Sequence, residues 1–483
     1  MDYSLPNQKT KIVCTIGPAS LSKDVLKRLI ASGMSVARLN FSHAGLDAHR
    51  KSIRTIREAS SETGRNIAIL ADLPGPKIRI GSIRGGSCIL RQGDDVVLTT
   101  RSVTGTSSLI PVQFGEFPEC VQAGERIFLN DGFIQLTVVG KKGRDIICRV
   151  DVGGRLLSKK GMNLPDSRLT LDAVTENDLA LLSFGIEEGV DLFGLSFVSR
   201  ALDIRKARRF ASKKGREIFV VAKIERREAL DHIEGIIAEA DAIMVARGDL
   251  GVEIPIEQVP VVQKQLIIQA NLASKPVITA TQMLESMISN TRPTRAEATD
   301  VANAVFDGTD AVMLSEETAI GSYPAEACGM LSKIAQAAEA KRAAVPSGMI
   351  VPETIIRSVE TASRSVEDVL SLDVVRSIGS LGINSVVVPT RGGSTARMIS
   401  RFKSNAWIIA LCRDEQALKH LCLSYGVHPL LKGDISSDEA IVSSLRGKGL
   451  ISSRESVILV RQDPCGGLGS AHTLRVITPG PSG

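Results

Sequence analysis

The chain has 483 residues, 43% of them hydrophobic and 23% charged, and it carries a formal net charge of +6. At roughly 100 to 200 residues per domain, this length predicts two to four domains. The net charge is too small to indicate a nucleic-acid-binding protein, and aromatic residues, at 3%, are too few for a base-stacking surface, so we expect no nucleic-acid partner.

Eight short apolar runs follow one another along the chain, and most of them are followed by a helix-like segment. Nearly continuous apolar residues are typical of strands covered on both faces, as in a parallel sheet. The segment 22–33 shows the helical pattern well, since Ser22 is a suitable N-cap and Gly33 ends the pattern. Eight β–α units predict an α/β fold with a closed (β/α)8 TIM barrel, and the alternative is an open doubly wound sheet. The eight runs cover residues 11–17, 35–42, 66–73, 190–198, 217–225, 241–250, 275–283 and 309–318.

The pattern changes between the third and fourth runs, where short strands alternate with turns that contain glycine and aspartate. These strands predict a small all-β lid, entered through the sequence PGP at 74–76, with a hairpin turn at KKG, residues 141–143. After about residue 345, a helix-like segment over 352–372 and later strands predict a C-terminal α/β domain with a mostly parallel sheet. We therefore expect a barrel domain of residues 1–74 and 171–345, a lid domain of residues 75–170 and a C-terminal domain of residues 346–483.

No segment has the apolar length of about 20 residues that a membrane helix needs, and the N-terminus is polar. The cysteines form no C-x-x-C pair, which argues against a zinc site and a disulfide framework. Free thiols are typical of a reducing compartment, so we expect a cytoplasmic protein with no membrane partner.

Polar residues gather at the carboxyl ends of the predicted barrel strands, where catalytic groups of such barrels lie. Lys223 and Glu225 are two apart on one strand and share a face. Glu225 and Asp249, from neighbouring strands, are suitable ligands for Mg²⁺. Cations and Mg²⁺ around an anionic pocket predict phosphoryl transfer, and the alternative is that Lys223 and Glu225 form only an ion pair at the rim. The collected strand-end residues are Arg38, Asn40, Ser42, His43, Asp72, Lys223, Glu225, Arg247, Gly248, Asp249, Thr279, Thr281, Ser315, Glu316 and Glu317.

Several long motifs resemble the pyruvate kinase family over the barrel, the lid and the tail. They are VARLNFSH, GPKIRIG, SKKGMNLP, AKIE, MVARGDLGVE, ITATQMLESM and RPTRAEATDVANAVFDGTDAVML. The resemblance implies transfer of a phosphoryl group from phosphoenolpyruvate to ADP, which gives pyruvate and ATP. It also implies dependence on Mg²⁺ or Mn²⁺, an enolate intermediate and a homotetramer.

The resemblance implies roles for single residues. Lys223 neutralises the phosphoryl group during transfer, Arg38 binds the substrate phosphate, and Glu225 with Asp249 binds the metal. The substrate carboxylate is bound by the backbone of Gly248 and the hydroxyl of Thr281, and Thr281 or Ser315, acting through water, protonates the enolate. The nucleotide side comprises Asn40, Ser42, His43, Arg79 and Lys160.

The stretch ADLPGPKIRIG departs from the family pattern. Potassium-requiring members carry Thr and Glu where this chain has Leu73 and Lys77. The family's monovalent-cation ligands match Asn40, Ser42 and Asp72. We expect the ammonium of Lys77, across a rigid turn from Asp72, to replace the K⁺ charge, so that K⁺ is not required. The alternative is a solvated turn lysine.

Two further features leave alternatives open. Glu316 stands where the family has glycine and adds a carboxylate at the last strand end. In the tail, the glycine-rich strand–helix connection is expected to bind a phosphorylated allosteric effector through Thr390, Arg391, Ser394 and Thr395, and the alternative is a plain turn. The rival functions are another Mg²⁺-dependent, enolate-forming barrel lyase and a catalytically silent regulatory homologue.

Overall fold

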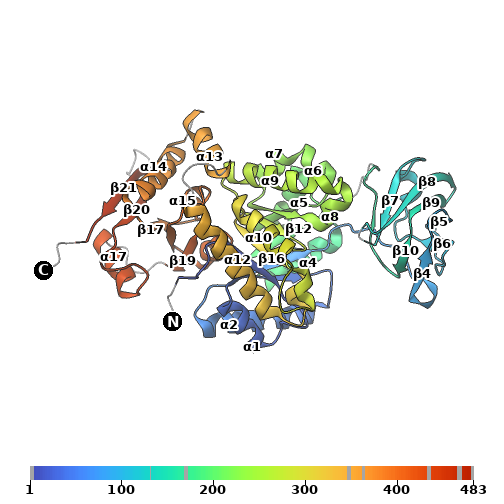
Figure 1. The fold of residues 1–483 in the computed structure, drawn as a ribbon, viewed down its shortest axis with the longest axis horizontal. Coiled ribbons are helices and arrows are strands. Elements are labelled where there is room, and N and C mark those ends of the chain that lie inside the picture. The colour runs from blue at the N-terminus through green and yellow to red at the C-terminus, as the bar shows by residue number, and fades with distance from the viewer. Residues whose placement is uncertain are drawn as a thin grey trace.

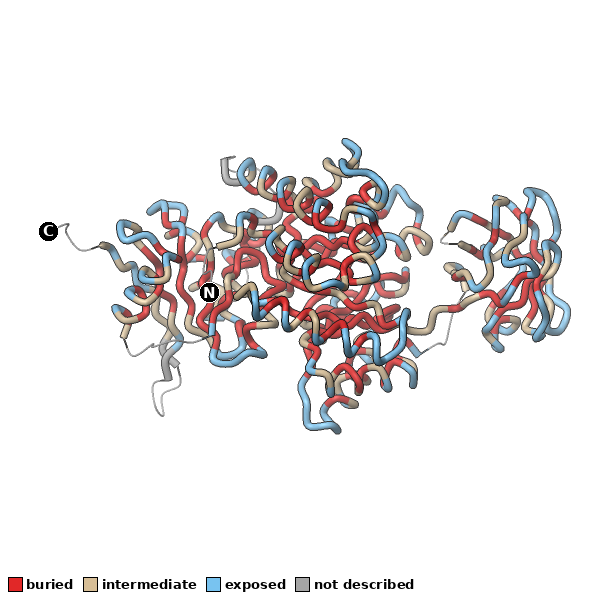
Figure 2. Tube along the Cα trace, turned by 90° about the horizontal axis from the view of Figure 1, so that it is seen from below, coloured by how far each residue is buried: buried red, intermediate tan, exposed pale blue. Residues whose placement is uncertain are grey.

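The computed structural model describes residues 5–130, 132–167, 172–344, 350–361, 365–431, 437–464 and 470–479. Figure 1 shows three parts in a row, with the barrel between the β-rich insert at one end and the C-terminal sheet at the other. Each part has buried residues of its own (Figure 2), and those of the insert form a separate hydrophobic cluster.

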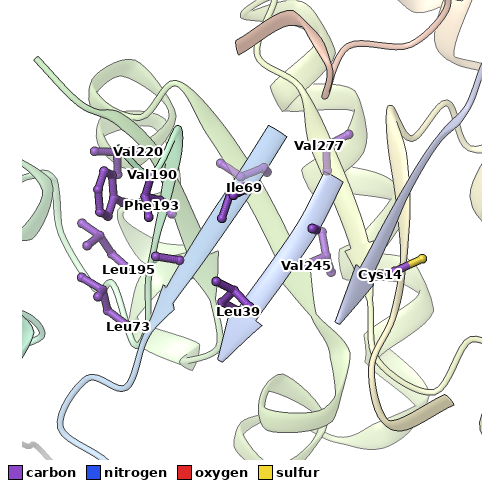
Figure 3. Packing of buried hydrophobic residues seen from close by; sticks show 14 of the residues in the cluster. Cys14, Leu39, Ile69, Leu73, Val190, Phe193, Leu195, Val220, Val245 and Val277 are labelled. Atoms are coloured by element: carbon purple, nitrogen blue, oxygen red, sulfur yellow. The ribbon is translucent and has the colours of Figure 1, made fainter. Parts of the chain in front are cut away.

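Eight parallel strands close into a barrel in the order β1-β16-β15-β14-β13-β12-β3-β2, as predicted, and the open-sheet alternative is wrong. The outward side chains of these strands pack against the surrounding helices, and Figure 3 shows Ile69, Phe193 and Leu195 among them. Because all eight strands are parallel, their carboxyl ends meet at one mouth of the barrel. The strands are β1 Lys11–Thr15, β2 Met34–Asn40, β3 Ala68–Leu73, β12 Leu192–Leu195, β13 Phe219–Ile224, β14 Ala242–Ala246, β15 Val277–Ala280 and β16 Ala311–Leu314.

The helices that follow the strands form the outer layer of the barrel (Figure 1). The predicted cap at Ser22 is confirmed, because its hydroxyl oxygen accepts a hydrogen bond from the backbone N–H of Val25 at 3.3 Å. The helices are α1 Lys23–Ala31, α2 Leu46–Thr63, α4 Glu176–Glu187, α5 Ala201–Lys213, α6 Arg227–Asp231, α7 Ile233–Glu239, α8 Arg247–Glu253, α9 Val259–Leu272, α10 Arg295–Phe306, α11 Glu316–Ala319 and α12 Pro324–Ala344. None of the described helices is long and apolar enough to cross a membrane.

The insert consists of a two-stranded sheet, β10-β4, and a six-stranded sheet, β11-β7-β8-β9-β5-β6. It is not purely β, because Phe117–Cys120 form a short helix, α3, with Pro118 in its first turn and Phe117 buried. The predicted hairpin lies slightly later than KKG: Gly143, with φ of 60°, and Arg144 connect the paired Lys142 and Asp145. The strands are β4 Ser87–Leu90, β5 Asp95–Thr99, β6 Leu109–Pro111, β7 Arg126–Leu129, β8 Ile134–Lys142, β9 Asp145–Val152, β10 Gly154–Leu157 and β11 Met162–Asn163.

The C-terminal sheet has the order β19-β18-β17-β20-β21 and is parallel except for the β20–β21 pair, as predicted. The helix-like segment expected over 352–372 contains two helices, because α13 ends at Thr361 and α14 starts after Ser365, whose hydroxyl caps it. The elements are α13 Ile350–Thr361, α14 Val366–Leu381, β17 Ser385–Thr390, α15 Ser394–Ser400, β18 Trp407–Cys412, α16 Glu415–Leu421, β19 Val427–Leu431, α17 Asp438–Gly447, β20 Val457–Pro464 and β21 Ser470–Ile477.

Candidate active site

A buried cluster of charges occupies the barrel mouth at the ends of β2, β3 and β13. The Lys223 ammonium lies 3.0 Å from Asp72 Oδ1 and 2.8 Å from Glu225 Oε1, and it donates to the Ser196 hydroxyl at 2.7 Å. Arg38 Nε donates to Asp72 Oδ2 at 2.7 Å. Asp72 and Glu225 are 2% and 1% exposed, so two cations and two carboxylates balance one another away from water.

The protonation states of this cluster follow from its packing. Burial works to lower the pKa of Lys223, but the carboxylates of Asp72 and Glu225 outweigh burial and hold that pKa above its usual value. Burial works to raise the pKa of Asp72, yet Lys223 and Arg38 together hold it below its usual range. Lys223 therefore carries a positive charge at neutral pH, at a fixed position.

The ends of β14 and β15 bring Gly248 and Thr281 together. The backbone N–H of Gly248 donates to Thr281 Oγ1 at 2.8 Å, and this hydroxyl donates to the Ala280 carbonyl at 2.7 Å. Thr281 and Gln282 have φ values of 68° and 54°, an arrangement that non-glycine residues rarely adopt. The strained turn directs the Thr281 hydroxyl to the start of α8, the helix that carries Asp249.

Glu225 and Asp249 fit a divalent cation by their chemistry. Burial raises the pKa of Glu225, Lys223 opposes this shift, and the carboxylate of Asp249 nearby adds to it. Two carboxylates that approach each other are stabilised by a cation between them. Within the described ranges, no group of three or more His, Cys, Asp or Glu side chains is placed to hold a metal. Two carboxylate ligands leave the other coordination positions of the metal to water or substrate oxygens, an arrangement that Mg²⁺ prefers.

The two glutamates at the last strand end have different surroundings. Glu317, not its neighbour Glu316, is buried, and its carboxylate accepts hydrogen bonds from the backbone N–H groups of Ser315 at 2.6 Å and Leu284 at 3.1 Å. Glu316 is exposed at the start of α11. Glu317 thus holds Ser315 against the turn that follows Thr281.

The predicted nucleotide-side residues fall into two groups. Asn40 lies at the end of β2, where its side-chain oxygen accepts from the backbone N–H of Ser42 at 3.1 Å, and Ser42 and His43 are exposed. Arg79 and Lys160 belong to the insert, where the chain at Arg79 pairs with Gly161. The structure therefore brings Arg79 next to Lys160, on a different part of the fold from Asn40.

Lys77 lies elsewhere than expected. Its ammonium is 3.3 Å from Asp249 Oδ1, whereas Asp72 is held by Arg38, Lys223 and Ser196. The physical reason is that two cations already neutralise Asp72, whereas the side chain of Asp249 is 28% exposed and has room for a partner. The independence from K⁺ stays a prediction.

Several residues that support the site had no role predicted from the sequence. Thr15 accepts from Arg38 Nη1 at 2.8 Å, and Ser196 accepts from Lys223. Arg247 donates to the carbonyl of Thr281 at 2.6 Å and to Asp300 at 2.7 Å. Their position at or near strand ends is the only sequence signal for these residues. Their contacts join different strands, so spacing along the chain does not predict them.

The expected effector residues lie at the carboxyl end of β17 and the start of α15. The Thr390 hydroxyl accepts from the backbone N–H of Gly393 at 2.9 Å, and Arg391 and Ser394 are exposed, with Thr395 half-buried. The Thr390 contact is that of an ordinary strand–helix connection, so effector binding stays a prediction.

Comparisons with known proteins agree with this architecture. The family model for the pyruvate kinase barrel domain matches residues 7–328, and the model for the pyruvate kinase alpha/beta domain matches residues 368–477. A pyruvate kinase of Thermococcus litoralis is 45% identical over 472 residues, which are 98% of this chain and 99% of the relative. A pyruvate kinase of Geobacillus stearothermophilus is 41% identical over 477 residues, which are 97% of this chain and 80% of the relative.

A solved structure extends the likeness to three dimensions. The crystal structure of a pyruvate kinase from Cryptosporidium parvum matches with a TM-score of 0.89 at 34% identity, and the match covers 98% of this chain and 96% of that one. Family models and relatives span both the barrel with its insert and the C-terminal sheet. The chain therefore belongs to the pyruvate kinase family.

Proposed function

We propose that this protein transfers the phosphoryl group of phosphoenolpyruvate to ADP and releases pyruvate and ATP. The observation that carries the proposal is the buried Lys223 ammonium, held at the barrel mouth by Asp72, Glu225 and Ser196. A phosphoryl group in transfer spreads negative charge over its equatorial oxygens, and a preorganised cation stabilises that charge without reorganising.

The other residues of the mouth have complementary tasks. Arg38, oriented by Asp72 and Thr15, binds the substrate phosphate. The backbone of Gly248 and the Thr281 hydroxyl bind the substrate carboxylate. Glu225 and Asp249 hold Mg²⁺ or Mn²⁺, which supplies Lewis-acid charge when bound.

Transfer leaves the enolate of pyruvate, which is protonated at carbon. Thr281 or Ser315 delivers this proton through water, since both lie at the barrel mouth at the ends of neighbouring strands, β15 and β16. Asn40, Ser42, His43, Arg79 and Lys160 contact the nucleotide, and the last two come from the insert.

The proposal includes the wider organisation predicted from the sequence. The domains comprise residues 1–74 with 171–345, residues 75–170 and residues 346–483, and four copies form a homotetramer. A phosphorylated effector binds the C-terminal domain. A cytoplasmic location agrees with the cysteines in the described part of the chain, which are free thiols.

The two rival functions predict different chemistry. An enolate-forming lyase has no use for ADP, nor for the cations that the insert presents on Arg79 and Lys160. A silent homologue has no need of Lys223 with its two buried carboxylates, an arrangement that costs desolvation energy.

A coupled assay tests the proposal. With phosphoenolpyruvate, pyruvate is expected only when ADP and Mg²⁺ or Mn²⁺ are both present, and Lys223→Met should lower kcat by roughly 10²- to 10³-fold or more. Lys403→Met is the matched control, since Lys403 is also buried and lies 2.7 Å from Asp310, which precedes β16 at the opposite end of the barrel. Pyruvate formed without ADP would mean that water accepts the phosphoryl group and would indicate a phosphatase. No pyruvate from phosphoenolpyruvate and ADP would favour the two rivals, the lyase and the silent homologue.

The same assay, made free of Na⁺ and K⁺, tests the prediction about monovalent cations. Full activity is expected in that buffer. A strong rise on adding KCl at constant ionic strength would show that Lys77 does not replace the cation.

A further inference from the structure

Among the described residues, the insert contacts helix α8 of the barrel through Lys77, Gly132 and Asn163. The Lys77 ammonium lies 3.3 Å from Asp249 Oδ1, and Asn163 Nδ2 donates to Glu253 Oε1 at 3.3 Å. Gly132 packs so closely that a β-carbon added to it would lie 3.3 Å from Val252. Figure 1 shows α8 at the side of the barrel that faces the insert. We call these three contacts the α8 clasp.

The clasp joins separate segments of the insert to a helix of only seven residues. Lys77 lies in the exit from the barrel, Gly132 precedes β8, and Asn163 ends β11. Their partners occupy both ends of α8, so a movement of the insert acts on the whole helix and on the carboxylate of Asp249.

The environment of Lys77 differs from that of Lys223. The Lys77 and Asp249 side chains are each 28% exposed, whereas the Lys223 side chain is 10% exposed. The stem of Lys77 passes so close to Gly161 that a β-carbon there would lie 2.9 Å from Lys77 Cε. Lys77 is thus packed by the insert along its stem and paired with the barrel at its charged end.

We infer that Lys77 is a positioning residue that competes with the divalent cation for Asp249, so that metal binding opens the α8 clasp. The inference rests on the proposed assignment of Asp249 as a metal ligand. A divalent cation at Asp249 repels the ammonium from its place and takes over its carboxylate partner. Of the three described contacts, those of Asn163 and Gly132 with α8 then remain.

The first test measures metal affinity without catalysis. Binding of Mn²⁺ to the full chain, free of substrates, is followed by the electron paramagnetic resonance signal of unbound Mn²⁺. Lys77→Met should bind Mn²⁺ roughly three- to fivefold more tightly, because a competing ion pair of this exposure is lost. Lys77→Arg keeps the charge and should stay close to the unsubstituted chain, and Asp249→Asn should lose most of the affinity.

The outcomes separate this inference from the proposed function. Equal affinity in Lys77→Met and the unsubstituted chain, with loss in Asp249→Asn, overturns the competition and leaves the metal assignment standing. Equal affinity in Asp249→Asn and the unsubstituted chain overturns both. Tighter binding in Lys77→Arg as well as Lys77→Met would show that packing, not charge, is responsible and would also overturn the inference.

The second test measures the clasp itself by hydrogen–deuterium exchange. Mn²⁺ should speed backbone exchange in residues 74–79 and 247–253 of the unsubstituted chain, since it releases Lys77. Lys77→Met should exchange fast there before Mn²⁺ is added and change little afterwards. Asn163→Ala should loosen the same segments while leaving the Mn²⁺ affinity unchanged. Exchange that Mn²⁺ slows, or leaves unaltered, in the unsubstituted chain contradicts the opening of the clasp.

Discussion

Arg247 illustrates how single side chains at the barrel mouth act on their neighbours. It follows β14, and its guanidinium reaches the carbonyl oxygens of Ala280 at 3.1 Å and Thr281 at 2.6 Å beyond β15. The left-handed backbone of Thr281 costs on the order of 1–3 kcal/mol and persists only when its surroundings hold it. Arg247 stabilises this conformation through these two hydrogen bonds, and Asp300 in turn fixes its guanidinium by accepting a hydrogen bond.

Replacing Arg247 by lysine should therefore displace Thr281. Lysine keeps the charge but cannot donate several hydrogen bonds from one plane. We expect kcat/KM for phosphoenolpyruvate to fall roughly 10- to 100-fold, with a rise in KM for phosphoenolpyruvate and little change in KM for ADP. Steady-state kinetics with each substrate varied in turn measures the difference.

Arg208 offers a control of the same kind at the other end of the barrel. It donates to the carbonyl groups of Ile218 and Glu239 and to Asp241. Arg208→Lys should cost stability but leave both KM values unchanged. An equal rise of KM for ADP in Arg247→Lys would argue for a general loss of structure.

At the scale of elements, α10 shows how a local signal is used in the tertiary structure. Thr294 and Glu297 form a capping box, and the Glu297 carboxylate also accepts from the backbone N–H of Ser286 at 2.7 Å. Ser286 lies in the short helix Glu285–Ile288, which follows the strained turn at Thr281. Glu297, part of the cap of α10, therefore also fixes the segment that follows Thr281.

Thr294→Ala should destabilise the protein by about 1 kcal/mol, because the backbone N–H of Glu297 loses its acceptor. The Tm measured by calorimetry should fall by about 1–3 °C. Thr299→Ala, on the exposed face of the same helix, is the control and should be neutral or slightly stabilising, since alanine favours helices. An equal loss in both variants would show that the cap itself contributes nothing.

At the scale of the whole molecule, the C-terminal sheet docks against the N-terminal end of the barrel. Lys11 of β1 donates to the carbonyl of Val427 at 2.7 Å, and Asp310 accepts from the backbone N–H of Tyr425 at 2.9 Å. Buried side chains of the barrel interior and of this sheet belong to one hydrophobic cluster. A cavity of about 1270 Å³ remains beside this junction, and His420 and His428 line it.

These two histidines make the junction sensitive to acid. Burial lowers the pKa of His420 to about 4 and, with Lys11 nearby, lowers the pKa of His428 to about 3. In the unfolded chain, histidines have a pKa of about 6.5. Between pH 6.5 and pH 4, the unfolded chain therefore binds more protons at these two positions than the folded chain does. The contribution of these histidines to the free energy of unfolding is therefore fully present above pH 6.5. It is lost as the pH is lowered, by about 1 kcal/mol per pH unit for each histidine.

Unfolding by urea at pH 7.5, 6.0 and 5.0 measures this slope. His428→Gln should reduce the slope, because the side chain no longer titrates. The exposed His232 is the control, and His232→Gln should leave the slope as it is. A slope that His428→Gln leaves unchanged would mean that other groups, such as carboxylates, govern the acid response.

The repeating elements and the positions of the charged strand ends could be predicted from the sequence alone. Parallel buried strands have a local signature, and Lys223, Glu225 and Asp249 follow such strands directly, so closing the barrel brings them together. The family motifs then predicted the chemistry. The boundary between two helices at Ser365 was harder to predict, because an N-cap residue within a helix-like sequence gives only a weak local signal.

Which side chains pair with one another depends on the folded arrangement of the chain. Arg247, Ser196 and Glu317 act through contacts between residues far apart in the chain, and spacing within one strand carries no information about them. Lys77 is the clearest case, because its sequence neighbour Asp72 is neutralised by residues from β2 and β13. Lys77 pairs instead with Asp249, a carboxylate whose charge is less neutralised by other cations. Asp249 is within reach of Lys77 only when the insert lies against α8.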